Sequence, residues 1–331
     1  MPAVPPREDG ADALRSAAVA VDLPGRGALA VLGPDAAATV HGLVTNEVKS
    51  LRPGAGCHAA LLTPKGRMRA ELVVLRSSEE ELLLDCDPAL AGPLAEILAG
   101  YVPFSRSRLE DRTAAVGIVH LEGPQASGVL AAAGLPVPGT APYDHVADGT
   151  GSGIVRVVRV SRAGEAGFDL RASRERAPSL LERLVSGGAR AAGLDVLEAG
   201  RIEEGIPRWG AELTESVLPN EAGLERTAIS YTKGCYLGQE TVARLKTYGH
   251  VNRHLVALIL PPGSGVAPGD AVRSEDAVVG KVTSAAESER RGRRVALAFV
   301  KREHEAPGTR LDVESAGGAV PGVVAAVPLE P

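Results

Sequence analysis

The sequence predicts an α+β protein, in which helices and strands are mixed through the first 249 residues and a small β-barrel follows them. A strand-like run, a Gly-Pro turn and a helix-like segment occur in this order at Gly33 and again at Gly123, which indicates two related halves. After residue 250, short strand-like runs are separated by Gly, Pro and charged residues, as is typical of a small barrel. A chain of 331 residues is long enough for two or three domains.

The first half contains four predicted strands and two helices. The strands are residues 28–32, 59–62, 68–75 and 81–86, and the helices follow Gly33 and cover residues 88–101. Pro34 suits the first turn of a helix because its ring presets φ. Pro64 and Gly66 form a credible hairpin turn between the second and third strands. Cys86 alternates within a Leu-rich strand, so we expect it in the core.

The second half and the barrel follow the same kind of pattern. We expect strands at 119–122, 155–160 and 168–171, a loop at 134–153, and helices at 177–185, from Asp195, and at 239–248. The six barrel runs are 254–260, 271–273, 278–283, 294–300, 309–313 and 323–327. These elements predict a mobile tail at 1–12, an α+β region at 13–249 and a barrel domain at 250–331.

Composition excludes several classes of protein. The chain has 36 basic and 41 acidic residues, and a net charge of −5 argues against stable, direct binding of nucleic acid. Cys57, Cys86 and Cys235 are too far apart for a CxxC pattern, so we expect neither a metal site nor disulfides. No apolar run reaches the roughly 20 residues that span a bilayer. We therefore expect a cytoplasmic monomer with no membrane association.

One stretch, residues 233–244 with the sequence KGCYLGQETVAR, carries the most specific chemical signal. Cys235 stands just before a predicted helix and two residues after Lys233, and both the helix dipole and a positive charge favour thiolate over thiol. Gly234 and Gly238 suit a tight loop that presents the thiol. The alternative is a buried cysteine in an ordinary turn.

This stretch resembles the signature of the YgfZ-type folate-binding proteins, which are relatives of the glycine-cleavage T-protein (aminomethyltransferase). Residues 201–210, 218–221, 45–48 and 62–67 also resemble that family in order and spacing. The resemblance implies two intertwined ferredoxin-like halves and a six-stranded barrel, arranged as a ring around a folate channel. It also implies that tetrahydrofolate, or a C1-substituted derivative, is bound.

The resemblance further implies an accessory protein that supports iron-sulfur cluster assembly or repair in client enzymes, among them radical enzymes that methylthiolate tRNA. Cys235 would be the functional thiol, with Lys233 as its electrostatic partner. Glu203 would hydrogen-bond the pterin, with Arg201 behind it. The other residues that the resemblance places at the cofactor are Trp209, Tyr236, Gln239, Glu240 and Arg244.

Several alternatives remain open. Glu203 could be a solvated helix residue, Trp209 and Tyr236 could simply pack, and the hairpin residues Lys65 and Arg67 could reach a folate tail or only face water.

The function also has alternatives. A folate-dependent C1 transferase would need a carboxylate near folate, yet the family's Asp-Asp pair is replaced by Ala70 and Glu71. A thiol-dependent acyltransferase would need a histidine near Cys235, and the nearest in sequence are His250 and His254.

Overall fold

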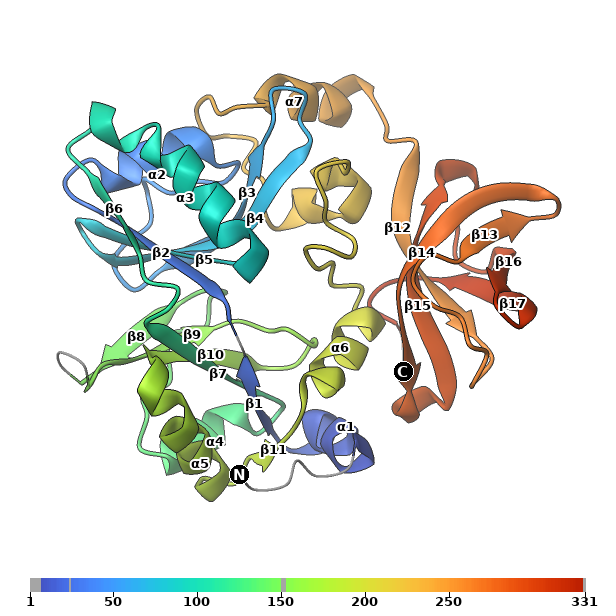
Figure 1. Cartoon of the computed structure of the whole chain (residues 1–331), viewed down its shortest axis with the longest axis horizontal. Coiled ribbons are helices and arrows are strands. Elements are labelled where there is room, and N and C mark those ends of the chain that lie inside the picture. The colour runs from blue at the N-terminus through green and yellow to red at the C-terminus, as the bar shows by residue number, and fades with distance from the viewer. Residues whose placement is uncertain (1–6, 24, 150–152, 330–331) are drawn as a thin grey trace.

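The computed structural model describes residues 7–23, 25–149 and 153–329. Its elements form three parts, two units built on β-sheets and a C-terminal barrel, which are arranged around the centre of the molecule (Figure 1). The predicted α+β class with a closed six-stranded barrel is therefore confirmed.

The first unit is a five-stranded antiparallel sheet in the order β3-β4-β5-β2-β6. Its strands are β2 (Gly27–Leu32), β3 (Gly56–Leu62), β4 (Met68–Ser78), β5 (Glu81–Cys86) and β6 (Arg108–Asp111). Helices α2 (Ala36–Leu43) and α3 (Ala91–Ala99) pack on one face, where Leu72, Leu84 and Leu94 share a buried cluster. Cys86 is fully buried in this cluster, as predicted.

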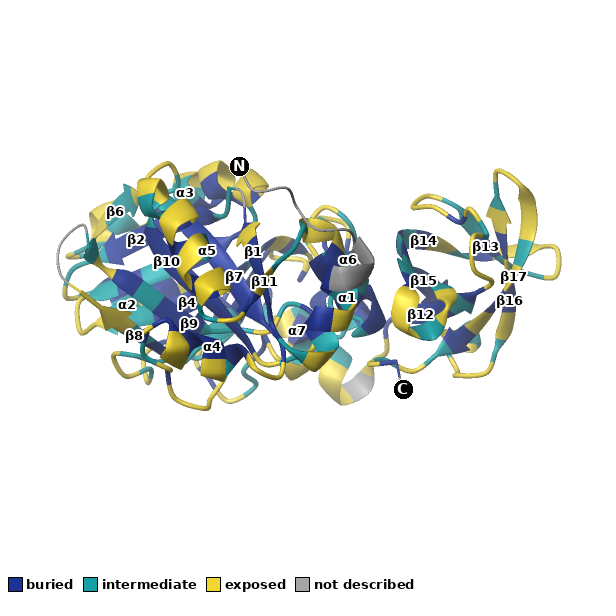
Figure 2. Ribbon diagram, turned by 90° about the horizontal axis from the view of Figure 1, so that it is seen from below, coloured by how far each residue is buried: buried dark blue, intermediate teal, exposed yellow. Residues whose placement is uncertain are grey.

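The second unit is a six-stranded sheet in the order β11-β1-β7-β10-β9-β8. Its strands are β1 (Val19–Leu23), β7 (Val116–Glu122), β8 (His145–Asp148), β9 (Val155–Arg159), β10 (Gly167–Ser173) and β11 (Arg190–Ala191). Strand β1 precedes the whole first unit in the chain but pairs with β7, which follows that unit. The two units are thus intertwined. Helices α4 (Ala126–Ala132) and α5 (Ala177–Ser186) cover one face of this sheet, and Figure 2 shows their exposed outer sides over the buried strands.

The barrel closes in the order β12-β15-β14-β13-β16-β17. Its strands are β12 (Arg253–Leu260), β13 (Ala271–Ser274), β14 (Ala277–Ser288), β15 (Arg293–Lys301), β16 (Arg310–Ser315) and β17 (Gly318–Ala325). Buried and exposed residues alternate along β16, as expected where one side of a strand fills a barrel. Each of the six predicted runs overlaps one of these strands.

Three more helices connect the parts: α1 (Arg7–Ser16), α6 (Leu194–Glu203) and α7 (Gln239–Tyr248). The shorter 3-10 helices are Pro88–Leu90, Val102–Phe104, Arg174–Arg176, Pro219–Ala222, Leu224–Arg226, Glu289–Arg291 and Arg302–His304. None of the helices in the described ranges is both long and apolar enough to cross a membrane.

Some predicted boundaries were wrong. Residues 7–12 of the predicted tail belong to α1, whose Leu14 packs against Val196 of α6, and residues 1–6 lie outside the described residues. The predicted loop at 134–153 contains β8, which pairs with β9 although only its first residue is buried. The predicted helix at 88–101 is divided into a 3-10 turn and α3. These elements depend on partners distant in sequence, so local periodicity did not reveal them.

Charged side chains lie between the two sheets, on the faces turned away from the helices. Asp85 of β5 accepts hydrogen bonds from Arg26 and from Arg171 of β10, so a buried ion pair links one sheet to the other. His120 of β7 is also fully buried, with Nδ1 2.7 Å from Asp169 and Nε2 2.6 Å from Glu122. Burial by itself lowers the pKa of His120. The hydrogen bonds and negative charges of Asp169 and Glu122 together outweigh this effect, so the net shift of the pKa is upward.

This arrangement predicts a dependence of stability on pH. Because the pKa of His120 is raised on folding, its contribution is complete below its unfolded pKa of about 6.5 and is lost as the pH rises through the folded pKa. We expect the urea midpoint of the wild type to fall as the pH rises above neutrality, and the fall to be smaller in His120→Asn. Equal slopes for the two proteins would contradict the assignment.

Candidate functional site

The predicted thiol loop leads into α7, which begins at Gln239 as predicted, and it packs on the hairpin between β3 and β4. Gly238 has φ +83°, and a Cβ there would lie 2.5 Å from the carbonyl oxygen of Thr63. Gly66 at the hairpin tip has φ +75°, and a Cβ there would lie 2.8 Å from Thr241. Both glycines are therefore needed for the close approach of two backbone segments.

We expect Gly238→Ala to separate α7 from the hairpin. An alanine at positive φ costs about 1 to 3 kcal/mol, and here the carbonyl of Thr63 blocks the new methyl group as well. Gly234→Ala is the matched control, because a Cβ there meets no atom within 4 Å. Urea unfolding and proteolysis of the hairpin should distinguish the two variants. Similar stabilities would show that the contact with Thr63 is not required.

Lys233 is buried, and its ammonium group binds the backbone rather than lying free in the loop. Nζ donates to the carbonyl of Val44 at 2.6 Å and to that of His41, and it lies 5.0 Å from the centroid of the Tyr236 ring. Burial lowers the pKa of Lys233 to about 8. These contacts tie the loop to the end of α2, so the role of Lys233 as partner of the Cys235 thiol stays a prediction.

Cys235 is exposed, and the structure thus differs from the buried alternative. Cys86 is buried and Cys57 is half-buried, and burial raises the pKa of each thiol to about 12. Cys235 is therefore the most accessible thiol of the three.

Tyr236, by contrast, is only 8% exposed and packs in a cluster with Leu62 and Met68. The structure therefore supports the packing alternative for Tyr236.

The polar residues of α7 mainly serve the loop and the surface. Gln239 accepts a hydrogen bond from the backbone N–H of Tyr236 at 3.3 Å through Oε1, which closes the turn before the helix. Glu240 and Arg244 form an exposed ion pair one turn apart, with 2.7 Å between oxygen and nitrogen. Their predicted contact with the cofactor would require the ligand to reach the solvent-exposed face of α7.

Arg201 does not support Glu203, which corrects the predicted pairing. Its guanidinium binds Glu198, the carboxylate of Glu212 at 3.0 Å and the hydroxyl of Ser284 at 2.6 Å. Ser284 belongs to β14, so this buried group joins α6 to the barrel. Arg201 and Glu203 point in different directions because residues two positions apart on a helix are rotated by about 200°.

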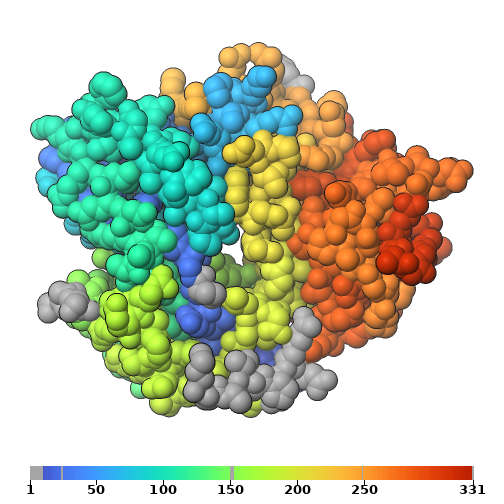
Figure 3. Space-filling view, in the orientation of Figure 1, coloured from blue at the N-terminus to red at the C-terminus, as the bar shows by residue number. Residues whose placement is uncertain are grey.

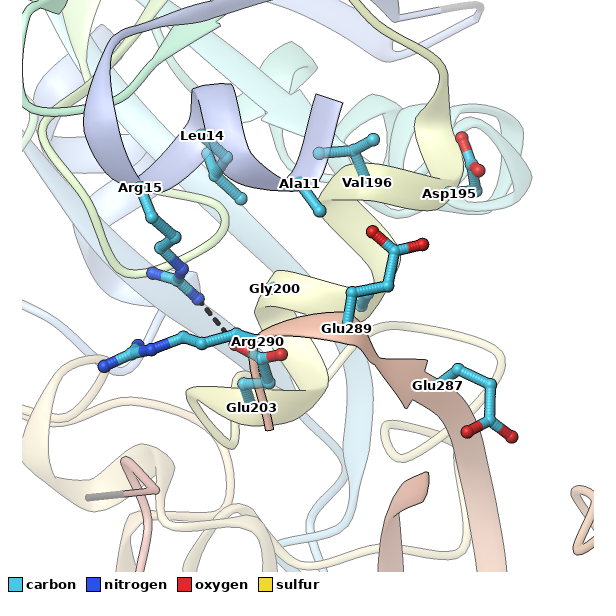
Figure 4. A pocket seen from close by; sticks show the side chains of 11 residues that line it. Ala11, Leu14, Arg15, Asp195, Val196, Gly200, Glu203, Glu287, Glu289 and Arg290 are labelled. Atoms are coloured by element: carbon cyan, nitrogen blue, oxygen red, sulfur yellow. Dashed lines mark hydrogen bonds and ion pairs between the residues drawn. The ribbon is translucent and has the colours of Figure 1, made fainter. Parts of the chain in front are cut away.

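The carboxylate of Glu203 is instead paired with Arg15 of α1, at 2.9 Å. The pair lies in a small pocket between α1, α6 and the barrel, and Figure 4 shows Arg290 crossing close to it. The lining residues are Ala11, Leu14, Arg15, Asp195, Val196, Ala199, Gly200, Glu203, Glu287, Glu289 and Arg290. A pterin bound by Glu203 would have to share or displace Arg15.

Trp209 and the hairpin residues Lys65 and Arg67 have different surroundings. Trp209 is half-buried and packs against both the core of the first unit and the cluster that contains Tyr236. Arg67 donates to the carbonyl of Ser216, and Lys65 is exposed.

The histidines considered for a thiol enzyme have other environments. His254 is paired with Glu305. His250 lines a surface groove together with Asn252, Lys301, Arg302, Glu303 and Glu305.

A group that the sequence did not reveal lies on the polar face of the first sheet. His58 of β3 and Glu71 of β4 are hydrogen-bonded, with 2.8 Å between Nε2 and Oε1. Burial is the largest single influence on the pKa of Glu71 and raises it. The hydrogen bond and charge of His58, together with the charge of Arg26, outweigh burial, so the pKa lies below its usual value. The neighbouring Ala70 points into the apolar core. The two residues are 13 positions apart in sequence and lie on adjacent strands, so only the register of those strands could have paired them.

The space-filling view shows a narrow opening at the centre of the molecule, between the two intertwined units and the segment that follows α6 (Figure 3). Thr45 and Asn46 fasten part of this segment to the first unit. Thr45 Oγ1 donates to the carbonyl of Ala228 at 2.6 Å, and Asn46 Nδ2 donates to the carbonyls of His58 at 2.8 Å and Thr227 at 3.2 Å. The first two residues of the 45–48 motif, Thr45 and Asn46, therefore hold two segments of the backbone together.

The chain matches two family models. Residues 5–233 match the GCVT N-terminal domain, and residues 253–329 match the glycine cleavage T-protein C-terminal barrel domain. An aminomethyltransferase of Streptomyces coelicolor is 28% identical over 96% of this chain and 87% of its own length. A putative chloroplastic transferase of Arabidopsis thaliana is 29% identical over 97% of this chain and 73% of its own length.

A solved structure shows the same fold. Aminomethyltransferase T of the glycine cleavage system from Bartonella henselae superimposes with a TM-score of 0.87 at 22% identity, over 99% of this chain and 91% of its own. Together the two family models cover most of the chain, which therefore belongs to the glycine cleavage T-protein family.

Proposed function

We propose that this protein binds tetrahydrofolate and is a folate-dependent C1 transferase that acts on an amine. The Glu71 carboxylate carries the proposal, since the resemblance to the family places Ala70 and Glu71 where aminomethyltransferases have their Asp-Asp pair. The proposal is supported by the lowered pKa of Glu71, the opening at the centre of the molecule and the similarity to proteins named aminomethyltransferases over nearly the whole chain.

Bound tetrahydrofolate would supply the nitrogen that accepts the one-carbon unit. A bond from this nitrogen to the one-carbon unit would form while the bond between that unit and the amine nitrogen breaks. Glu71 would accept the proton that the folate nitrogen loses and would return it to the departing amine. A carboxylate with a lowered pKa is in the basic form that this role requires. Glu203 would bind the pterin with its carboxylate, once its pairing with Arg15 is opened or shared.

The test is a titration with tetrahydrofolate and its methylene and formyl derivatives. We expect Glu203→Ala to weaken binding by about 1 to 3 kcal/mol, or about 5- to 150-fold, because it strands hydrogen-bonding groups of the ligand. Glu71→Gln should lose C1 transfer and bind folate with a lower affinity, because it lacks the carboxylate charge. Cys235→Ala should retain both. If the wild type binds none of these folates, the proposal is wrong; if Glu203→Ala binds as well as the wild type, only the pterin assignment fails.

The exposure of Cys235 favours a second candidate function, the support of iron-sulfur cluster assembly or repair in client enzymes, including those that methylthiolate tRNA. A single thiolate cannot hold a cluster that needs four cysteines, so the partner would supply the other ligands. Under this proposal, Cys235→Ala abolishes function in cells while folate binding persists. Cys57→Ala is the control, because Cys57 is half-buried and burial raises the pKa of its thiol to about 12. Full activity of Cys235→Ala in cells would exclude the role of the thiol.

A further inference from the structure

His58 and Glu71 are diagonal neighbours on adjacent strands. The register places His58 opposite Val73 and Ala60 opposite Glu71, so the two polar side chains leave the same face of the sheet two positions apart. Both are mostly buried, with 12% of the His58 side chain and 20% of the Glu71 side chain exposed. Among the described residues, His58 is the only hydrogen-bond partner of the Glu71 carboxylate.

We infer that His58 is the positioning residue for the Glu71 carboxylate, an inference that rests on the proposed transferase function. Glutamate carries one more methylene and one more rotatable bond than the aspartate it replaces, so its oxygens would otherwise be less well fixed. The hydrogen bond from His58 holds Oε1 and leaves Oε2 for a ligand. Histidine at position 58 thus compensates for the change from aspartate to glutamate at position 71.

The imidazole is itself held in place. Its Nδ1 lies 3.2 Å from the hydroxyl of Thr227, which can donate to it, so the ring proton is left on Nε2 for Glu71. Asn46 donates to the backbone carbonyls of both His58 and Thr227, and it thereby keeps these two residues together. Such support is what a reactive carboxylate needs to keep one orientation.

The second unit closes this site with Tyr143. The backbone of Tyr143 has φ 65°, a strained conformation for a residue with a large side chain, and its ring centroid lies 6.3 Å from that of His58. Gly56 makes the approach possible, because a Cβ there would lie 2.9 Å from the Cβ of Tyr143. The backbone N–H of Tyr143 is bonded to the carbonyl of Arg159 at 2.8 Å. The site is therefore complete only when the two intertwined units are docked.

Charged and titratable groups face Glu71 from both units. They are His58, Arg26, Asp85, Arg162, Tyr143 and Cys86. Burial is the largest influence and raises the pKa of Glu71, whereas His58 and Arg26 lower it. Removal of His58 should therefore move the protonation of Glu71 to higher pH, because the effect of burial would then be less opposed.

The experiment measures the affinity for 5-formyltetrahydrofolate between about pH 5 and 8, where an unshifted carboxylate near 4.5 would just begin to titrate. The variants are His58→Ala, His58→Gln and Glu71→Gln, with His254→Ala as a matched control from a half-buried His-Glu pair of the barrel. We expect a flat profile for the wild type and His254→Ala. In His58→Ala, affinity should fall at the acidic end, and His58→Gln, whose amide can still donate, should restore much of it. Glu71→Gln should show no acidic fall.

A ligand-free measurement keeps the test independent of folate. In a protein with ¹³C-labelled glutamate, the resonance that disappears in Glu71→Gln should titrate below pH 4.5 in the wild type and above it in His58→Ala. Identical titrations and identical binding profiles for the wild type and His58→Ala would overturn the positioning role while the proposed function stands. A wild type that binds no folate would instead remove the proposed function, and the resonance would still decide whether His58 controls Glu71.

Discussion

Asp85→Ala is expected to be among the most destabilising single substitutions in this protein. The Asp85 side chain is 4% exposed and is the shared partner of Arg26 and Arg171, whose side chains are 18% and 7% exposed. Loss of the carboxylate would leave two largely buried guanidinium groups without their counter-charge, a change that typically costs about 3 to 5 kcal/mol. Since Arg171 lies in the second unit and Asp85 in the first, the docking of the two units should loosen as well.

Urea unfolding at neutral pH measures this effect, and hydrogen exchange of β5 and β10 reports the loss of docking. Asp35→Ala is the control, because the pair of Asp35 with Arg106 is exposed to solvent and is screened. Comparable losses for Asp85→Ala and Asp35→Ala would contradict the view that the inter-sheet pair is worth more than a surface pair. The wild type should also lose stability in acid, since the pKa of Asp85 is lowered by Arg26 and Arg171 despite burial.

Arg201→Ala is expected to have the second large effect. It removes the counter-charge of Glu212, which is fully buried, and it also breaks the hydrogen bond from Arg201 to Ser284 of the barrel. An unpaired buried carboxylate typically costs about 3 to 5 kcal/mol. The barrel should therefore separate more easily from α6, which limited proteolysis between the two parts would detect.

Arg244→Ala provides the comparison, because the sequence assigned Arg201 and Arg244 alike to the cofactor site. The side chain of Arg244 is 73% exposed and that of Glu240 is 86% exposed, so the midpoint of unfolding should hardly change. If Arg244→Ala proved as destabilising as Arg201→Ala, burial would not be what separates these two residues. Folate binding in Arg244→Ala would independently test its predicted contact with the ligand.

Local patterns carried much of the architecture. The barrel could be predicted because each of its strands is bounded by Gly, Pro or charged residues, and α7 because Gly238 and Gly249 delimit it. β1 could not be assigned to its sheet, because the chain between it and its partner β7 forms an entire other sheet.

The candidate site, too, could be predicted from the sequence only in part. The sequence singled out Cys235 and Glu203 through a motif, but a motif does not state which neighbour binds which side chain. Arg15, 188 positions from Glu203, became its partner because α1 packs on α6. His58 was overlooked since an isolated histidine in a strand carries no signal of its own.

What the sequence alone determined is therefore most of the helices and strands, the barrel and the identity of the reactive types of residue, since these depend on neighbours a few positions away. Only the tertiary structure decided that Lys233 binds carbonyls of α2, that Arg201 joins α6 to the barrel, and that His58 meets Glu71. The physical reason is that hydrogen bonds and ion pairs act over about 3 Å in space, whatever the separation of their partners along the chain.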